Sequence, residues 1–391
     1  MRYYLIAGEA SGDLHGSNLI RGLRAEDPQA EFRFWGGDAM LEAAAVPEGA
    51  PSPLVRHYRD GAVMGFWEVI RHGRALLRRV RDCQADLLAW HPDAVILIDY
   101  PGFNFKIARF AHEHGLKVFW YIAPKTWASR ENRNRKLREW VDRLFIVFPF
   151  EQEYFRSRGV PFVYAGNPLL DAVDASPAMQ EAPEDFFRRH GLQPCRYVAL
   201  LAGSRSAEIR RMMPVLVDFA DRLRALPAYR DCEFILAGAP ARSAQDYLPA
   251  IGERPYVHLV FGDTYGVLRH AGAAVINSGT ASLEAALIGT PQVVCWSTSA
   301  FSAFVIRHIG RIYAHIKYIS LGNLILDRLA FRELVQEEFT AEAVTAEAVR
   351  LLGDESYRAQ MLSEYAEIRK ALGTAGASRA VASAMIAELK P

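Results

Sequence analysis

Two polar segments in the first half of the chain have residue types that could bind and activate a hydroxyl group. Residues 8–16 (GEASGDLHG) follow the strand-like run YYLIA and hold three glycines beside Glu9, Ser11, Asp13 and His15. Glycines let the backbone approach a ligand, and a helix beginning near Leu14 would direct free N–H groups towards it. The alternative is a tight strand-to-helix turn in which serine and aspartate cap the helix. The added glutamate and histidine favour a site.

The second such segment begins at Asp99, directly after the apolar run AVILI and before Pro101 and Gly102. An acid at the end of a buried strand is partly desolvated, which raises its pKa and suits it to accept a proton from a hydroxyl. Aspartate is also common in turns before Pro-Gly. Spacing alone leaves both interpretations open.

Two loops in the second half are suited to a nucleotide. Gly203, Ser204 and Arg205 follow the run YVALL, where helix N–H groups and a guanidinium could receive phosphate oxygens. The alternative is a surface Arg205 paired with Glu208. The second loop has the sequence NSGTASLEA and follows AAVI.

In that second loop, Gly279 and Thr280 begin a predicted helix, and Glu284 lies about one turn in. Its carboxylate could accept hydrogen bonds from a ribose diol. The alternative is simple helix capping.

Apolar strand patterns alternate with helical patterns along the chain, which predicts βαβ units and parallel sheets. The predicted strands are 3–7, 32–35, 94–98, 118–122 and 144–147, then 197–201, 232–237, 258–261, 273–276 and 291–295. We therefore expect two domains, 1–168 and 169–345, followed by a helical segment, 346–391. Ligands bind at the carboxyl ends of such strands, and two facing sheets would place one large site in the cleft between them.

Composition excludes several classes of protein. The 391 residues include 46 Lys and Arg against 45 Asp and Glu, whereas a general nucleic-acid binder is usually basic. The four cysteines are widely spaced, which is typical of reduced thiols in a cytosolic protein. There is no apolar run of about 18 residues and no secretory signal of the usual form.

These loops suggest that the two domains bind different substrates. The second domain would bind a nucleotide-linked donor, and the first would bind an acceptor and the base that activates it. This is the arrangement of a two-Rossmann-domain glycosyltransferase. No DxD-like acidic pair is placed to hold a metal, which fits a mechanism that uses arginine and helix ends instead.

Nine motifs in register strengthen this interpretation: AGEASGDLHG, VMGFWEV, IDYPGFN, APKTWA, FPFE, AGNPLLD, LAGSRSAEI, NSGTASLEAAL and YISLGNLI. Together they resemble the lipid-A-disaccharide synthase family over nearly the whole chain. The resemblance implies an α/β fold of two Rossmann-like domains (GT-B type), with C-terminal helices returning to the first domain. It also implies transfer of 2,3-diacylglucosamine from its UDP derivative to the 6-hydroxyl of 2,3-diacylglucosamine 1-phosphate (lipid X), without a cofactor or metal.

The resemblance assigns roles to individual residues. Asp99 would be the catalytic base. The donor side would comprise Gly203, Ser204, Arg205, Gly279, Thr280, Glu284 and Asn323, and the acceptor side Glu9, Ser11, Asp13 and His15. Two positions depart from the family pattern: Ser129 replaces a usual aromatic residue, and Asn167 replaces a frequent histidine.

Substrates with acyl chains imply a surface that faces the membrane. Met64, Phe66 and Trp67 precede a predicted helix that presents Arg71, Arg74, Arg78 and Arg81, with Val69, Leu76, Leu77, Val80 and Leu87 towards the core. A second basic and apolar stretch is 301–318. Such surfaces dock on anionic lipid, although ordinary amphipathic helices look similar. We expect a peripheral enzyme on the cytoplasmic face of the inner membrane.

Two other functions remain open. One is a UDP-N-acetylglucosamine 2-epimerase on the same fold, which would need no acceptor. The other is a non-catalytic nucleotide-sugar binding protein, in which Asp99 would be dispensable. The oligomeric state and the preferred acyl-chain length also stay open, and the Ala-rich segment 371–387 could either return to the first domain or form a subunit contact.

Overall fold

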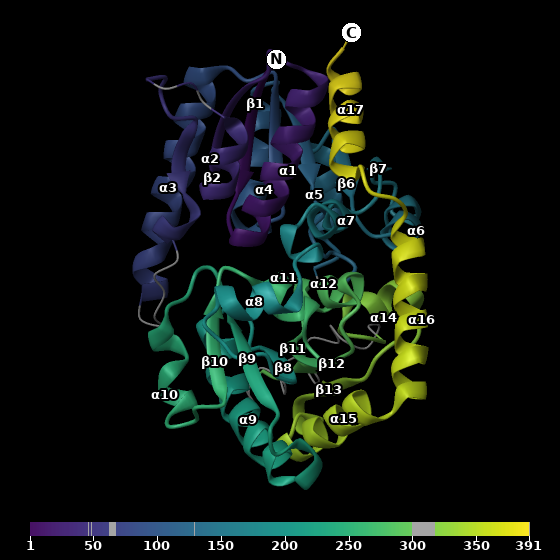
Figure 1. Ribbon diagram of the computed structural model, residues 1–391. Coiled ribbons are helices and arrows are strands. Elements are labelled where there is room, and N and C mark those ends of the chain that lie inside the picture. Colours follow the sequence, from purple (N-terminus) through teal and green to yellow (C-terminus); the bar gives the residue numbers. More distant parts are fainter. Residues whose placement is uncertain (46, 48, 62–67, 129, 299–316, 391) are drawn as a thin grey trace. The chain divides into compact units, whose positions relative to one another are not determined.

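The computed structural model describes residues 1–45, 47, 49–61, 68–128, 130–298 and 317–390, and the chain folds into two compact units (Figure 1). The first unit comprises Met1–Asp171 together with Thr374–Pro391, and the second comprises Ala172–Gly373. The predicted boundary after residue 168 lies three residues before the end of the first stretch. The predicted helical segment 346–391 is divided between the two units.

The first unit is built on a seven-stranded parallel sheet with the order β3-β2-β1-β4-β5-β6-β7. The strands are β1 (Arg2–Ala7), β2 (Glu31–Gly36), β3 (Leu54–His57), β4 (Ala94–Ile98), β5 (Lys117–Tyr121), β6 (Arg143–Ile146) and β7 (Phe162–Tyr164). Every residue of β4 is buried, as expected for a central parallel strand covered by helices on both faces. The outermost strands β3 and β7 are half-buried and are absent from the prediction.

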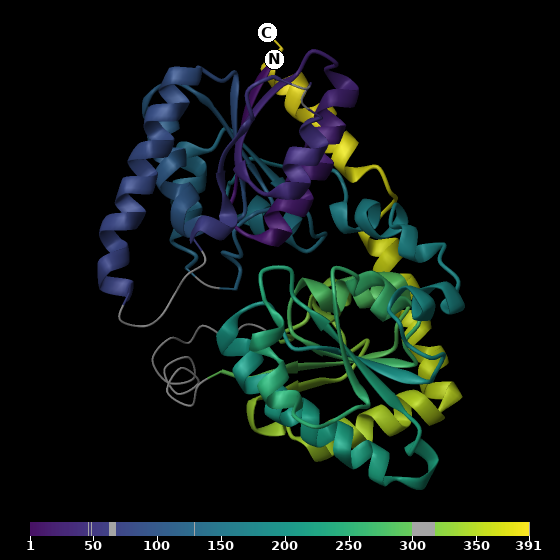
Figure 2. The ribbon, with the colours of Figure 1, turned by 60° about the vertical axis from the view of Figure 1, so that its left-hand side comes forward.

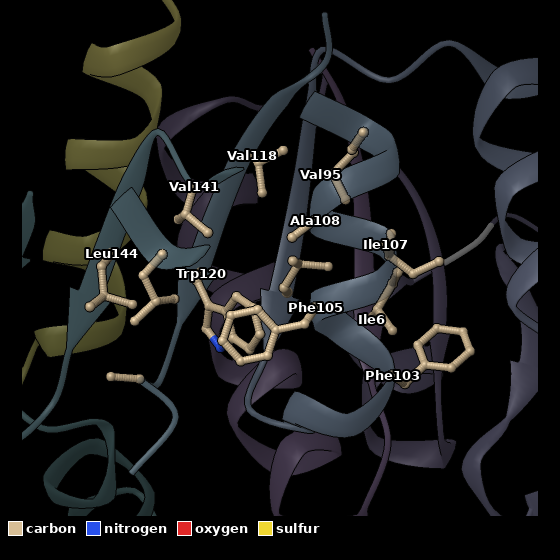
Figure 3. Close-up of a cluster of buried hydrophobic side chains, with 14 of the residues drawn as sticks. Ile6, Val95, Phe103, Phe105, Ile107, Ala108, Val118, Trp120, Val141 and Leu144 are labelled. Carbon is tan, nitrogen blue, oxygen red and sulfur yellow. The ribbon is translucent and has the colours of Figure 1, made fainter. Parts of the chain in front are cut away.

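Helices cover both faces of this sheet. They are α1 (Ala10–Glu26), α2 (Asp38–Ala44), α3 (Glu68–Trp90), α4 (Pro101–Glu113), α5 (Arg133–Trp140), α6 (Glu151–Ser157), α7 (Pro168–Asp174) and α17 (Ala377–Leu389). Figure 3 shows the core on one side of the sheet, where Phe105 of α4 packs on Trp120 of β5 with ring centroids 4.6 Å apart.

The prediction that Leu77 of α3 is a core residue is wrong. The helix turns Val80, Cys83 and Leu87 inwards, and Leu76 packs partly against them, but Leu77 is 50% exposed. Successive residues of an α-helix are rotated by about 100°, so Leu77 lies outside the buried stripe that includes its neighbour.

Helix α17 brings the end of the chain back to the first unit, where it packs against α1 (Figure 1). The two backbones approach so closely at Gly22 that an added Cβ would lie 2.8 Å from the carbonyl oxygen of Ser378. Asp171 fixes the start of α17, because its carboxylate accepts hydrogen bonds from the backbone N–H groups of Gly376 and Ser378, at 2.5 and 2.8 Å. The expected return of the C-terminal helices is therefore confirmed for α17.

The second unit has a six-stranded parallel sheet with the order β10-β9-β8-β11-β12-β13. Figure 2 shows helices on both sides of this sheet. Its strands are β8 (Tyr197–Leu201), β9 (Glu233–Gly238), β10 (Val257–Phe261), β11 (Ala273–Asn277), β12 (Gln292–Trp296) and β13 (Glu333–Val335). The helices are α8 (Pro183–Arg189), α9 (Ser206–Ala225), α10 (Leu248–Ile251), α11 (Thr264–Arg269), α12 (Thr280–Ile288), α14 (Leu321–Leu326), α15 (Ala341–Gly353) and α16 (Glu355–Leu372). Helix α15 packs against α9, and α16 packs against α12 and α14.

Each sheet reverses its strand order once. In the first, β1 lies between β2 and β4, and Ala7 pairs with Ile98. In the second, β8 lies between β9 and β11, and Leu201 pairs with Ile276. Ligands of doubly wound folds bind outside the carboxyl ends of the strands at such a point. The predicted segments after β1 and β4, and those after β8 and β11, therefore begin where the fold favours a ligand site. The predicted α/β class with two Rossmann-like domains is confirmed.

Within the described residues, no helix is long and apolar enough to cross a membrane.

Candidate active site

The turn after β4 holds Asp99 in an uncommon conformation. Asp99 and Tyr100 both have left-handed backbones, with φ values of 43° and 45°. Such residues cost free energy unless neighbouring groups fix them, and they cluster at functional sites. The ring of Tyr100 lies over Gly8, where an added Cβ would approach a ring atom to 2.3 Å. A glycine is required there because the β1 and β4 loops touch.

Asn104 supports the same turn and was not among the predicted site residues. Its side chain is fully buried, and Nδ2 donates hydrogen bonds to the carbonyl oxygens of Asp99, at 2.8 Å, and Ile98, at 3.3 Å. The backbone N–H of Asp99 donates to the carbonyl oxygen of Tyr121 at 3.1 Å. The motif IDYPGFN thus contains both the candidate base and the amide that orients its peptide.

Helix α1 begins earlier than predicted, at Ala10 rather than near Leu14. Its glycines serve helix packing: an added Cβ would lie 3.2 Å from the Cβ of Ala7 at Gly12, and 2.6 Å from the Sδ of Met40 at Gly16. The predicted start of the helix near Leu14 is therefore wrong, and Gly12 and Gly16 both lie within the helix.

The four predicted acceptor residues divide into two pairs. Glu9 and Ser11 are exposed, at the start of α1. Asp13 is buried and caps helix α2, because its carboxylate accepts hydrogen bonds from the backbone N–H groups of residues 37, 39 and 40 at 2.7, 3.1 and 3.1 Å. His15 is also buried, and burial lowers its pKa to about 4, so the imidazole is neutral at pH 7.

Three further motifs meet in one buried network in the first unit. Glu151, from FPFE, accepts hydrogen bonds from the indole Nε1 of Trp127, from APKTWA, at 3.1 Å and from the backbone N–H groups of Val147 and Phe148 at 3.2 and 3.1 Å. Burial raises the pKa of Glu151 to about 7. Asn167, from AGNP, donates to the carbonyl oxygen of Val147 at 2.9 Å. This asparagine, which replaces a frequent histidine, therefore has a packing role, whereas Ser129 lies outside the described residues.

The loop after β8 is arranged around Glu208. Gly203 has a φ of 97°, a conformation that favours glycine, and it leads into exposed Ser204 and Arg205. The Glu208 carboxylate accepts hydrogen bonds from the backbone N–H groups of Ser204 and Arg205, at 3.1 and 3.2 Å, and from the Arg205 guanidinium, at 3.1 Å. The ion pair weighed from the sequence is present, and its carboxylate also occupies the two backbone N–H donors of the loop.

The loop after β11 leads directly into α12. Gly279 precedes the helix, and Thr280 is its first residue. Oε1 of Glu284 accepts a hydrogen bond from the hydroxyl of Tyr265 at 3.0 Å, and burial raises the pKa of Glu284 above its usual range. Tyr265 was not predicted, because it lies on α11, distant in sequence from the motif that it supports.

Asn323 is fully buried within its own motif. Its Nδ2 donates to the carbonyl oxygen of Phe331, at 3.0 Å, and to Glu333, at 2.8 Å, and its Oδ1 accepts from the backbone N–H of Ala330 at 2.8 Å. Glu333 also accepts the backbone N–H groups of Ile319 and Ser320, each at 2.9 Å. The Asn323 amide therefore links α14 to β13. Through Glu333 the same network also fixes the backbone of Ile319 and Ser320, which precede α14.

The predicted membrane-facing residues Met64, Phe66 and Trp67 lie outside the described residues, as do residues 301–316 of the second stretch. In the described part of α3, Arg78 and Arg81 are exposed, as predicted.

Solved structures share this fold. The UDP-N-acetylglucosamine 2-epimerase of Neisseria meningitidis, solved with UDP-N-acetylglucosamine, superposes with a TM-score of 0.69 at 12% identity, covering 99% of this chain and all of that one. A structure described as the glycotransferase of kitacinnamycin superposes with a TM-score of 0.57 at 15% identity, covering 100% and 99% of the two chains. At these identities the likeness concerns the fold alone.

Sequence comparisons are more specific. The family model described as lipid-A-disaccharide synthetase matches residues 3–386. A lipid-A-disaccharide synthase of Geobacter sulfurreducens is 34% identical over 387 residues, which cover 98% of this chain and 96% of the relative. One of Syntrophus aciditrophicus is 36% identical over 384 residues, covering 97% and 95%. The chain belongs to the lipid-A-disaccharide synthase family.

Proposed function

We propose that this protein transfers 2,3-diacylglucosamine from UDP-2,3-diacylglucosamine to the 6-hydroxyl of lipid X, giving a β-1,6-linked disaccharide 1-phosphate and UDP. The observation that carries this proposal is the match to the synthase family from residue 3 to 386, in which the motif residues follow strands at the switch point of each sheet. The first unit would bind the acceptor, and the second would bind the donor.

In the first unit, Asp99 acts as the base. Its place after a wholly buried strand, in a left-handed turn braced by Asn104, supports this role, since a base must be held within hydrogen-bonding distance of the proton it removes. Glu9 and Ser11 contact the acceptor; their exposure at the start of the helix that follows β1, the neighbour of β4, supports this role. Asp13 and His15 act indirectly, by supporting that helix and its neighbour.

In the second unit, Ser204 and Arg205 bind the diphosphate, and Thr280 and Glu284 bind the nucleoside. The pairing of β8 with β11 supports this assignment, because it places the two loops side by side. Asn323 acts by shaping the adjacent segment.

The reaction is a single inverting displacement. Asp99 takes the proton of the 6-hydroxyl while that oxygen bonds to the anomeric carbon, and the bond from this carbon to the diphosphate breaks. Arg205 and the amino ends of α9 and α12 stabilise the charge that develops on UDP. No step requires a cofactor.

Both substrates have acyl chains, so we place the protein peripherally on the cytoplasmic face of the inner membrane. Exposed Arg78 and Arg81 on α3 support attraction to anionic lipid.

The test is UDP release from UDP-2,3-diacylglucosamine, with and without lipid X, together with mass analysis of the product. We expect UDP and a disaccharide 1-phosphate to appear together, and only when lipid X is present. The same preparation is incubated with UDP-N-acetylglucosamine alone. Epimerisation of this compound without transfer to lipid X would replace the proposal by the epimerase interpretation, and UDP binding without either reaction would favour a binding protein.

A further inference from the structure

Arg242 reaches the Gly203-Ser204-Arg205 loop from a neighbouring strand. It follows β9, which pairs with β8, and its guanidinium donates from Nε to the carbonyl oxygen of Ser204 at 2.9 Å and from Nη1 to the hydroxyl of Ser206 at 2.6 Å. One planar group therefore holds the residues on both sides of Arg205. No motif of the sequence indicated this residue.

The turn that presents Arg242 is itself fixed. The backbone N–H of Arg242 donates to the carbonyl oxygen of Ala239, and the N–H of Ala239 donates to the hydroxyl of Tyr247, each at 3.0 Å. Tyr247 is fully buried. The guanidinium therefore extends from an anchored turn, which lowers the entropy cost of holding a long side chain in one position.

Two guanidinium groups, those of Arg205 and Arg242, flank the loop. The Glu208 carboxylate pairs with Arg205 at 3.1 Å. Among the described residues, no carboxylate forms an ion pair with Arg242. If the diphosphate of a sugar nucleotide replaces the Glu208 carboxylate at the two backbone N–H groups, its negative charges meet both guanidinium groups.

We propose that Arg242 is a positioning residue of the donor site, which holds the Ser204–Ser206 backbone in place while a sugar-nucleotide diphosphate takes the position of the Glu208 carboxylate. This inference rests on the proposed donor site. By fixing the Ser204 carbonyl, Arg242 fixes the adjoining peptide planes, so the N–H groups stay aimed at the anion. The positive charge of Arg242 also favours binding of the diphosphate anion.

The test compares Arg242→Ala and Arg242→Lys with Arg254→Ala. Arg254 is a matched control in the same unit. It donates to the carboxylate of Asp221, at 2.8 and 2.7 Å, and to the carbonyl oxygen of Ile251, at 2.9 Å. Because it precedes β10, it lies towards the amino ends of the strands, whereas Arg242 lies at the carboxyl ends. The measurements are UDP affinity by calorimetry, without turnover, and KM for donor and for lipid X.

We expect Arg242→Ala to weaken UDP binding and raise the donor KM by about tenfold to a hundredfold, in line with loss of charge-assisted hydrogen bonds. The KM for lipid X should stay unchanged. Lysine keeps the charge but cannot reproduce the fork, so Arg242→Lys should fall between alanine and wild type. It also keeps the test open if the alanine variant fails to fold.

Equal UDP affinity in Arg242→Lys, Arg254→Ala and wild type would overturn the inference, as would a lower melting temperature in Arg242→Ala with unchanged UDP affinity. A wild type that does not bind UDP would overturn the donor site and this inference together. If wild type binds UDP and the arginine variants behave as expected, but no disaccharide forms, the proposed transfer fails while the role of Arg242 stands.

Discussion

The carboxyl edges of the two sheets have the same topology but use their acidic side chains differently. In the first unit, Asp13 and Glu151 are buried, and each accepts three hydrogen bonds from protein N–H groups that include two or more backbone amides. In the second unit, Glu208 is partly exposed and is bound to residues that are themselves exposed. Asp13 and Glu151 therefore stabilise the fold of the first edge, whereas we propose that the Glu208 carboxylate is a counterion that a ligand replaces.

Residues that stabilise the fold (framework residues) and exposed residues available to a ligand (contact residues) occur even within one motif. Ser11 and Asp13 are two positions apart in AGEASGDLHG, yet one side chain is exposed and the other is buried as a helix cap. A motif is therefore a mixture of both kinds, and experiments can distinguish them by measuring stability and activity separately.

The largest effect is expected at Asp99, the proposed base of the first edge. Asparagine tolerates the left-handed conformation that Asp99 adopts, with φ of 43°, so Asp99→Asn removes the base with little strain. We expect kcat to fall by about 10²- to 10⁴-fold, with UDP affinity and melting temperature unchanged. Steady-state kinetics and thermal denaturation check this. A kcat within threefold of wild type would make Asp99 a turn residue.

Asp13 should affect stability instead. Asp13→Ala leaves the backbone N–H groups of Gly37 and Met40 buried without their acceptor. We expect the free energy of unfolding of the first unit to fall by about 3 kcal/mol, measured by urea denaturation. Ser11→Ala, at an exposed position on the same helix, is the control and should change it by less than about 0.5 kcal/mol. Equal effects of the two substitutions would remove the distinction between framework and contact residues.

Glu151 should make the stability of the first unit depend on pH. Its pKa is about 7 in the folded protein against an ordinary 4.5, so the folded state binds the proton more tightly than the unfolded state. Its contribution to stability is therefore complete below pH 4.5 and is lost as the pH rises through 7, a decrease of up to about 3 kcal/mol.

Denaturation midpoints of wild type and Glu151→Gln across this pH range measure the effect. His15, whose pKa burial lowers to about 4, contributes a slope of the opposite sign to wild type and variant alike. The variant should lack the Glu151 slope, because glutamine does not titrate. Glu153→Gln, which changes an exposed residue of the same helix paired with Arg156, should retain it. Parallel pH profiles for wild type and Glu151→Gln would show that Glu151 titrates normally.

The smallest effect is expected at Tyr265, which supports Glu284, the proposed donor contact of the second edge. Tyr265→Phe removes the hydrogen bond to Glu284 and should raise the donor KM about fivefold, equivalent to about 1 kcal/mol, with kcat unchanged. Tyr256→Phe, which removes a hydroxyl bound to Asp221, is the control and should leave the donor KM unaltered. A change in kcat rather than in KM would contradict a role in donor binding.

The central strands could be predicted because they are buried on both faces. The apolar runs 94–98 and 197–201 coincide with β4 and β8. The edge strands β3 and β13 could not be predicted, since they are short and mostly half-buried and therefore lack a continuous apolar pattern. The start of α1 was misplaced because Gly12 and Gly16 resemble loop glycines, although they allow close packing against Ala7 and Met40.

The positions of candidate residues beside strands could be predicted: Asp99 directly follows β4, and Ser204 lies three residues after the end of β8. Their supporting contacts could not, because Arg242 bonds to Ser204 from 38 positions away and Tyr265 to Glu284 from 19. Such pairs depend on which strands become neighbours. The local pattern also does not distinguish an exposed polar side chain from one that caps a distant helix.

The return of α17 to α1 has a consequence for how the chain is made. Helix α1 ends at Glu26 and α17 begins at Ala377, so about 350 residues leave the ribosome between them, which takes roughly 20 to 70 s at 5–20 residues per second. During that time the face of α1 around Gly22 has no covering helix, while the second unit can already fold. The nascent first unit is therefore a candidate client for chaperones that bind exposed apolar surface, and its final folding step must follow the synthesis of the second unit and of α17.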